Sequence, residues 1–267
     1  MPGGLELVRD GAVFQVILDR PQRLNALDGA LRLGIAETMH VASSDDSVGA
    51  IVITGRGDRA FCAGQDLNES AELGAEAGPA WMETWKRFFA GISGCTKPIV
   101  AAVNGTAAGA GLQLMLMADV RLAVPGARLL MAEVNVGLPA IAGSCLLDIH
   151  LGQSRMRDLV LSGDAFTAEQ AKSWGLVQEI CPREALSTRA REMATVLAGK
   201  PPLAMKLTVG FLRNRLRERL AEAERAAAAY QSEAIASGQP QRAMQQFLAA
   251  KAAAAQSDEE KSETGRV

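Results

Sequence analysis

Short apolar runs rich in β-branched residues recur along the first two-thirds of the chain, and each ends in turn residues. Between them, apolar residues return every three or four positions, the spacing of one helix face. The runs predict strands over Val13–Leu18, Ala50–Thr54, Ile99–Val103, Val120–Val124, Arg128–Met131 and Leu176–Ile180. The helical patterns cover Ala30–Ser43, Ala80–Ile92, Gly109–Ala118, Ser154–Ser162 and Thr167–Gly175, and the last begins with a capping box of Thr167 and Gln170. The repeated order β–β–α predicts an α/β fold.

The composition changes after the prolines at 201 and 202, because only helical patterns remain beyond them. A helix over Leu203–Tyr230 carries Leu212, Leu216 and Leu220 on one stripe, and the arginines beside it, Arg213 included, fit a solvated face. A last helix is expected from about residue 241. The chain is therefore expected to consist of a core over residues 1–199, a helical oligomerisation region over 200–255 and a disordered tail over 256–267.

Net charge, the length of apolar runs and the spacing of histidines and cysteines argue against several classes of protein. The chain of 267 residues has 28 Lys and Arg and 30 Asp and Glu, so its formal net charge is −2. This balance argues against a nucleic-acid binder, which would be basic. No apolar run reaches the length of a membrane helix, and the N-terminus does not resemble a signal peptide, so a soluble cytoplasmic protein is expected. Two distant histidines, His40 and His150, and four cysteines without C-x-x-C spacing predict neither a metal site nor a disulfide framework, which leaves His150 only as a lone base.

Two segments of small residues follow predicted strands. Phe61–Leu67 would let a ligand approach the backbone closely, with the N–H groups after Gly64 as anion donors, although alone it predicts no more than a loop. Asn104–Gly111 opens a helix whose free N–H groups could hold a phosphate or an oxyanion. Its glycines also fit the dinucleotide loop of short-chain dehydrogenases, but the only tyrosine, Tyr230, is not followed by the required lysine.

A third segment contains a candidate proton carrier. Glu133 follows the predicted strand Arg128–Met131 and is bracketed by small and apolar residues. Desolvation there would raise the pKa of its carboxyl group and make it a better base near neutral pH. A salt-bridged surface acid is the alternative reading of the same residue.

In their order along the chain, these segments resemble the crotonase superfamily, the enoyl-CoA hydratase/isomerase family. The resemblance runs from about Leu5 to Lys251 and rests on motifs throughout the chain: Asp19–Pro21 with Leu24–Leu27, Phe61–Leu67, Lys97–Gly105, Leu159–Asp164 and Ala168–Val177. It implies an α/β, crotonase-like spiral of β–β–α turns with a C-terminal helical trimerisation region, and a homotrimer or homohexamer.

The resemblance also implies a site for an acyl-CoA thioester. The backbone N–H groups of Gln65 and Ala110 would form the oxyanion hole, with Glu133 and Gln113 as the catalytic side chains. Coenzyme A is expected as part of the substrate, without another cofactor or a metal. Its expected contacts are Arg23, Leu24, Ala26, Ala63, Gly64, Asp66, Leu67, Gly111, Phe247 and Lys251, with the last two reaching over from a neighbouring subunit.

The sequence departs from the family's hydratases at one carboxylate. Those enzymes have two glutamates, whereas this chain keeps Glu133 and has Gln113 at the other position. A glutamine can hydrogen-bond water or the thioester side, but it cannot take up a proton. One carboxylate suits a proton shuttle, so the sequence favours double-bond isomerisation over hydration of an enoyl-CoA. A non-catalytic or weakly catalytic acyl-CoA-binding protein is the alternative.

Four aromatic residues recur at helical spacing: Trp81, Trp85, Phe88 and Phe89. This spacing favours a position in the core, and a place at the border of the acyl pocket is the alternative.

Overall fold

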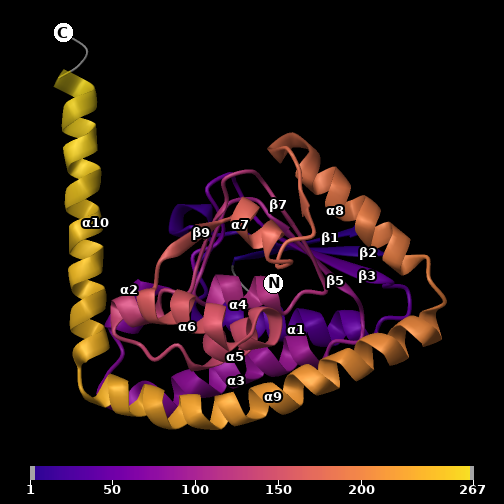
Figure 1. The fold of residues 1–267 in the computed structure, drawn as a ribbon, viewed down its shortest axis with the longest axis horizontal. Coiled ribbons are helices and arrows are strands. Elements are labelled where there is room, and N and C mark those ends of the chain that lie inside the picture. The colour runs from indigo at the N-terminus through magenta and orange to yellow at the C-terminus, as the bar shows by residue number, and fades with distance from the viewer. Residues whose placement is uncertain (1–3, 265–267) are drawn as a thin grey trace.

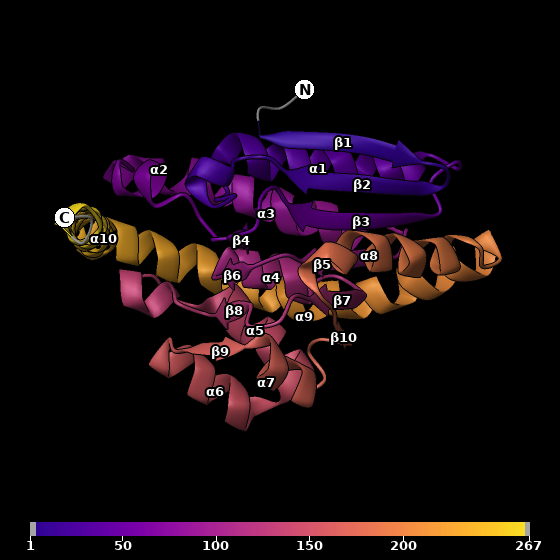
Figure 2. The ribbon, with the colours of Figure 1, turned by 90° about the horizontal axis from the view of Figure 1, so that it is seen from above.

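Two β-sheets form the centre of the computed structural model, which describes residues 4–264 (Figure 1). The larger sheet has six strands in the order β1-β2-β3-β5-β7-β10, and only the β1–β2 pair is antiparallel. Figure 2 shows these strands side by side from β1 at one edge. Their bounds are β1 Leu5–Asp10, β2 Val13–Leu18, β3 Ala50–Gly55, β5 Ile99–Val103, β7 Val120–Ala123 and β10 Glu179–Ile180.

The smaller sheet has the order β4-β6-β8-β9, in which β4, β6 and β8 are parallel and β9 pairs antiparallel with β8. Its strands are short: β4 Ala60–Cys62, β6 Thr106–Ala108, β8 Arg128–Leu130 and β9 Ala165–Thr167. From β3 to β8, consecutive strands alternate between the sheets, since β3 leads to β4, β5 to β6 and β7 to β8. Helices follow each pair, so the predicted spiral of β–β–α turns is confirmed.

The helices surround the sheets. Those of the spiral are α1 Gly29–Ser44, α2 Leu67–Ala71, α3 Gly78–Gly94, α4 Ala110–Leu116, α5 Ile141–Leu151, α6 Gln153–Ser162, α7 Ala168–Ser173 and α8 Arg183–Ala198, with the short 3-10 helices η1 Pro21–Arg23, η2 Ala75–Ala77 and η3 Glu133–Val136. Two longer helices complete the chain: α9 Pro202–Ala236 and α10 Gln239–Thr264. Strand β5 is buried along its whole length, and the aromatic side chains of α3 pack in the same core: Trp81, Trp85, Phe88 and Phe89.

Two buried asparagines tie together the turns on which the site is built. Asn104, directly after β5, donates hydrogen bonds to the carbonyl oxygens of Gly55 and Gly57 and accepts one from Gly55 N–H. Asn25 has a left-handed φ of 56° and donates to the carbonyl oxygens of Arg56 and Ala60. Backbone groups in these irregular turns lack partners in a helix or a sheet, and the two asparagine amides supply the missing hydrogen bonds.

Most expected elements are present, with ends shifted by a few residues. Thr167 and Gln170 form the predicted capping box. The strand expected over Leu176–Ile180 contains only Glu179 and Ile180. The prediction omitted β1, β4, β6, β9, α2, α5 and α8. A strand of three residues is too short to show a periodic pattern, and α5 has apolar residues nearly all round, so neither gives a clear signal.

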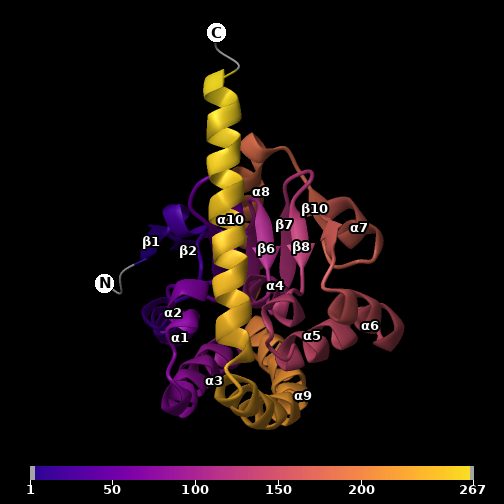
Figure 3. The same cartoon turned by 90° about the vertical axis from the view of Figure 1, so that its left-hand side faces the viewer.

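Helix α9 lies across one side of the spiral, and α10 leaves the body at its end (Figures 1 and 3). Arg213 was expected on a solvated face, but that expectation is wrong, because its side chain is only 3% exposed. Its Nη2 lies 2.6 Å from the Asp119 carboxylate, and its Nη1 donates to the Ile92 carbonyl oxygen at 3.0 Å. A charge-bearing side chain can be buried when partners of this kind compensate for the lost water.

The leucine stripe of α9 is only partly covered. Leu220 is buried and Leu216 packs against the core, whereas Leu212 is 52% exposed. The exposed stripe of α9 lies closer to its start and consists of Leu203, Leu207, Phe211 and Leu212. Residues 256–264, expected within a disordered tail, continue α10 as helix, while 265–267 lie outside the described residues. Alanine, the best helix former, is frequent just before them.

We predict that Arg213→Met lowers the free energy of unfolding by about 3 kcal/mol, because it leaves Asp119 without its cation. Arg215→Met, on the exposed face of the same helix, should change it by less than about 0.5 kcal/mol. Urea denaturation followed by circular dichroism measures both. Equal effects of the two substitutions would contradict a structural role for the Arg213–Asp119 pair.

Candidate active site

Three segments meet at the carboxyl ends of the parallel strands of the smaller sheet. The loop with Gln65 follows β4, the N-terminus of α4 with Ala110 follows β6, and η3 with Glu133 follows β8. These strands are neighbours in the sheet, so the residues that follow them lie close together although they are far apart in sequence. The edge formed by these strand ends is a common location for ligand sites in parallel sheets.

Two backbone N–H groups are available at this edge. Among the described residues, neither the Gln65 N–H nor the Ala110 N–H donates a hydrogen bond to the protein. Gly64 has a φ of 90° and lies so close to the other loop that a Cβ would be 2.5 Å from Ala108 O and 3.3 Å from Ala110 N. Glycine is therefore required at position 64, and the two loops approach as a pair of oxyanion donors needs.

The carboxylate of Glu133 lies beside these donors. A Cβ built at Gly109, next to Ala110, would be 3.5 Å from Glu133 Oε1. The Gln113 amide donates a hydrogen bond to Oε1 at 2.6 Å, while Oε2 is buried and has no partner within the described residues. Gln113 thus engages Glu133 itself, rather than only the water or thioester group that the sequence suggested. The salt-bridged alternative for Glu133 is wrong, since no cation pairs with it within that range.

Burial raises the pKa of Glu133 to about 7, against which the hydrogen bonds from its own backbone and from Gln113 act. A carboxylate with a pKa near neutrality can both take up and return a proton at pH 7. The expected desolvation of Glu133 is therefore present in the structure.

A cavity of about 870 Å³ opens over this edge. Its lining includes most of the residues that the sequence assigned to the substrate: Arg23, Leu24, Ala26, Ala63, Gly64, Gln65, Asp66, Leu67, Ala110, Gln113, Glu133 and Phe247. Gly111 is not among them, because it packs against β4, where a Cβ would clash with the Cys62 carbonyl oxygen. Phe247 reaches the cavity from α10 of the same chain, whereas the expected contact came from a neighbouring subunit. The side chain of Lys251 lies outside the described residues.

Asp66 lines the cavity, but its carboxylate is engaged elsewhere. It caps α2 through Asn68 N–H and pairs with Arg20 at 2.9 Å. Burial alone would raise the pKa of Asp66, but the hydrogen bonds from Arg20 and Asn68 hold it below its ordinary value. The carboxylate is therefore a structural anion that fixes the loop after Gln65.

The face of the smaller sheet forms the cavity floor. Thr106 and Ala108 of β6, with Arg128 and Leu130 of β8, line the cavity, whereas the residues between them point into the core. Arg59, directly before β4, lines the same end as Arg128. Sequence reasoning missed both arginines. Side chains alternate between the two faces of a strand, so the pattern of β6 and β8 could have indicated which residues face the cavity. Strands of three residues are too short to show that pattern.

The opposite part of the lining is apolar. Trp81, Trp85 and Phe89 of α3 contribute to it, together with Leu138 and Ile141. The sequence favoured a core role for the aromatic residues and kept a pocket border as the alternative. Both readings hold, because each of these three side chains is 6% exposed and also lines the cavity.

Other residues that the sequence raised lie outside this cavity. His150 was considered as a lone base, but its ring bonds the Leu116 carbonyl oxygen, and burial lowers its pKa to about 4. All four cysteines are free, as expected. Among the helices of the described residues, none combines the length and apolar character needed to cross a membrane.

Comparison with known proteins identifies relatives across nearly the whole chain. A family model described as "Enoyl-CoA hydratase/isomerase" matches residues 9–256. A 2,3-dehydroadipyl-CoA hydratase of Escherichia coli K12 is 36% identical over 77% of this chain and 80% of its own length. A 1,2-epoxyphenylacetyl-CoA isomerase of the same organism is 34% identical over 73% of this chain and 76% of its own length.

A solved structure supports the same assignment. The crystal structure of an enoyl-CoA hydratase/isomerase from Mycobacterium paratuberculosis has a TM-score of 0.86 and 26% identity, and the match covers 92% of this chain and 99% of that one. The matched fold, the matched sequence and the three segments at one sheet edge agree. The chain belongs to the enoyl-CoA hydratase/isomerase family of the crotonase superfamily.

Proposed function

We propose that the protein isomerises the double bond of an enoyl-CoA. The thioester oxygen accepts hydrogen bonds from the Gln65 and Ala110 N–H groups. The Glu133 carboxylate removes a proton from C2 of a 3-enoyl-CoA, and the electron pair of that C–H bond delocalises into a dienolate. Glu133 then returns the proton to C4, which leaves the double bond between C2 and C3. Charge develops on the oxygen, where the two donors stabilise it.

The single carboxylate at the reacting centre carries this proposal. Isomerisation moves one proton between two carbons, so one group with a pKa of about 7 is sufficient. Hydration also needs a water molecule to be activated, and Gln113, already hydrogen-bonded to Glu133, has no basic site. The relatives include a protein named as a 2,3-dehydroadipyl-CoA hydratase and one named as a 1,2-epoxyphenylacetyl-CoA isomerase, so their names do not decide between hydration and double-bond isomerisation.

Hydration of a 2-enoyl-CoA is the second candidate, and binding without turnover is the third. A spectrophotometric screen with 2-enoyl-, 3-enoyl- and aryl-CoA thioesters separates them. We expect 3-enoyl-CoA to be converted to 2-enoyl-CoA with little hydration. Gln113→Glu should raise hydratase activity at the expense of isomerisation, because a second acid–base group contributes roughly 100-fold or more. A hydratase rate that stays the same or falls would contradict this account of position 113.

We predict that Glu133→Gln reduces turnover by at least about 100-fold while acyl-CoA affinity stays within about tenfold, because the carboxylate acts on the proton and not on CoA. In the unsubstituted enzyme the base must be ionised, so kcat/KM should rise with pH and level off above about pH 7. Stopped assays over pH 5–9 measure the profile.

Gln113→Leu provides the matched control for this assignment. It removes a hydrogen bond that lowers the pKa of Glu133, so the midpoint of the pH profile should move upward. A midpoint that does not move, or more than a tenth of the activity left in Glu133→Gln, would assign the proton transfer to another group.

We propose that the CoA part of the substrate crosses the face of the smaller sheet, with its phosphates near Arg23, Arg59 and Arg128. All three arginines line the cavity, and no ion pair among the described side chains neutralises them. The apolar end beside Trp81 and Trp85 then suits the acyl group. The remaining expected contacts with CoA, including Lys251, stay predictions.

We predict that Arg23→Ala and Arg59→Ala each weaken CoA binding about three- to thirtyfold, with a smaller loss at high salt, because these charges are exposed and screened. Turnover of bound substrate should barely change. Arg56→Ala, whose side chain pairs with Glu6 and Asp19 outside the cavity, is the control. Calorimetric titration at two salt concentrations measures the affinities. Equal losses in all three variants would contradict a specific phosphate site.

We also propose that the enzyme is a homotrimer or homohexamer whose contacts include the exposed stripe of α9. Leu203, Leu207 and Phe211 are each more than 60% exposed in the single chain, and a surface of this kind favours a protein partner. The division into core and oligomerisation region, and the cytoplasmic location expected from the sequence, stay predictions.

A further inference from the structure

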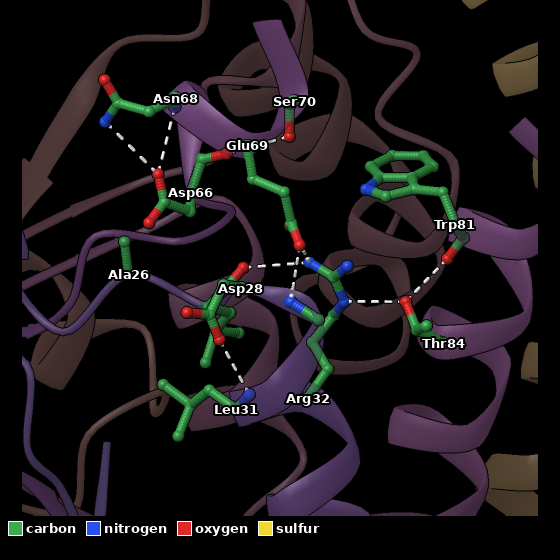
Figure 4. Close-up of polar contacts among 12 residues, drawn as sticks. Ala26, Asp28, Leu31, Arg32, Asp66, Asn68, Glu69, Ser70, Trp81 and Thr84 are labelled. Atoms are coloured by element: carbon green, nitrogen blue, oxygen red, sulfur yellow. Dashed lines mark hydrogen bonds and ion pairs between the residues drawn. The ribbon is translucent and has the colours of Figure 1, made fainter. Parts of the chain in front are cut away.

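Arg32 is the most deeply buried arginine in the neighbourhood of the site. It lies on the first turn of α1 and is 1% exposed, although the sequence gives it no motif. Its guanidinium reaches the carboxylate of Glu69 on α2 at 3.1 Å and the hydroxyl of Thr84 on α3 at 2.9 Å (Figure 4). The same group stacks over the Trp85 ring at 4.6 Å. Arg32 thus joins three helices, two of which carry walls of the cavity.

Arg32 also contacts the backbone that holds the oxyanion loop. Its Nη1 donates to the Leu27 carbonyl oxygen at 3.0 Å. That oxygen accepts a second hydrogen bond from Asp66 N–H, and Leu27 N–H donates to Gly64 O at 2.7 Å. Gln65 therefore lies between two residues that are tied to Leu27. A shift of the Leu27 carbonyl would move the Gln65 N–H directly.

Glu69 completes the arrangement. Its Oε2 pairs with Arg32, and its Oε1 accepts a hydrogen bond from Gly29 N–H at 2.8 Å, at the start of α1. Thr84 Oγ1 in turn donates to the Trp81 carbonyl oxygen on the cavity wall. The guanidinium thus has three polar partners: the Leu27 carbonyl oxygen, which also bonds the oxyanion loop, Glu69 on α2 and Thr84 on α3.

We propose that Arg32 is a positioning residue, which holds the Gln65 N–H in register with the aromatic wall of the acyl pocket. It touches no substrate atom and acts through Leu27, Glu69 and Thr84. This inference rests on the proposed function, in which the Gln65 N–H stabilises the enolate. Because an oxyanion donor must match the transition state closely, the effect of losing Arg32 should fall on kcat rather than on binding.

The test compares Arg32→Met with Arg213→Met, since both remove a buried arginine that is paired with a carboxylate. Arg213 lies outside the cavity lining. We expect Arg32→Met to lower kcat about 10- to 100-fold with KM within about threefold, and Arg213→Met to leave kcat within about twofold. Arg32→Lys, which keeps the charge, should recover part of the loss. The double variant Arg32→Met with Glu69→Gln removes the unpaired carboxylate and keeps the experiment informative if the single variant folds poorly.

Hydrogen–deuterium exchange separates this inference from the reaction itself. In Arg32→Met, the amides of Leu27 and Asp66 should exchange faster than in the unsubstituted protein, while Arg213→Met leaves them unchanged. Unchanged exchange at these amides, or an equal fall of kcat in both variants, would overturn the role of Arg32. Failure of the proposed reaction would appear differently, as an absence of isomerisation by the unsubstituted enzyme with the exchange difference intact.

Discussion

The parallel pairing of β4, β6 and β8 is the constraint on which the rest of this structure depends. Each strand has only three residues, yet the segment after each one supplies one part of the site. Backbone hydrogen bonds set the strands side by side and fix the separation of the loops that follow. Gly64 and Gly109 permit the close approach, because a side chain at position 64 would clash with Ala108 and Gly109 adopts a φ of 49°. The sheet therefore sets the position of the two N–H groups that we propose as oxyanion donors.

The electrostatics of the site follow from what surrounds that edge. Glu133 lies in a cavity wall without a cation, so burial raises the pKa of its carboxyl group into the range in which a proton can be exchanged at pH 7. Asp66 lines the same cavity, but the hydrogen bonds from Arg20 and Asn68 hold the pKa of its carboxyl group below its ordinary value. Two carboxylates beside the same cavity thus have pKa values shifted in opposite directions, because among the described residues only Asp66 is paired with a cation. Gln113 adds to this contrast, because its amide orients Glu133 without offering a second base.

Much of this protein could be predicted from local sequence. The strand Ile99–Val103 and the capping box at Thr167 follow from short-range preferences, and both are present where expected. The positions of Gln65, Ala110 and Glu133 at one site came from the order of the motifs and the resemblance to a family. Burial of Arg213 and the approach of Arg59 and Arg128 to the cavity could not be inferred in this way. The sequence around a charged residue is the same whether its side chain points into solvent or pairs with a residue on a distant helix.

The sequence by itself determined the strand–strand–helix repeat, the small residues at the two loops and the replacement of a second carboxylate by Gln113, because these depend on residue type and spacing along the chain. Only the tertiary structure decided which side chains share an environment. It placed the Gln113 amide 2.6 Å from Glu133, buried Arg32 between α1, α2 and α3, and left part of α9 exposed. Desolvation, hydrogen-bond partners and surface exposure depend on contacts between residues far apart in the chain, and those contacts exist only after the sheets and helices have packed.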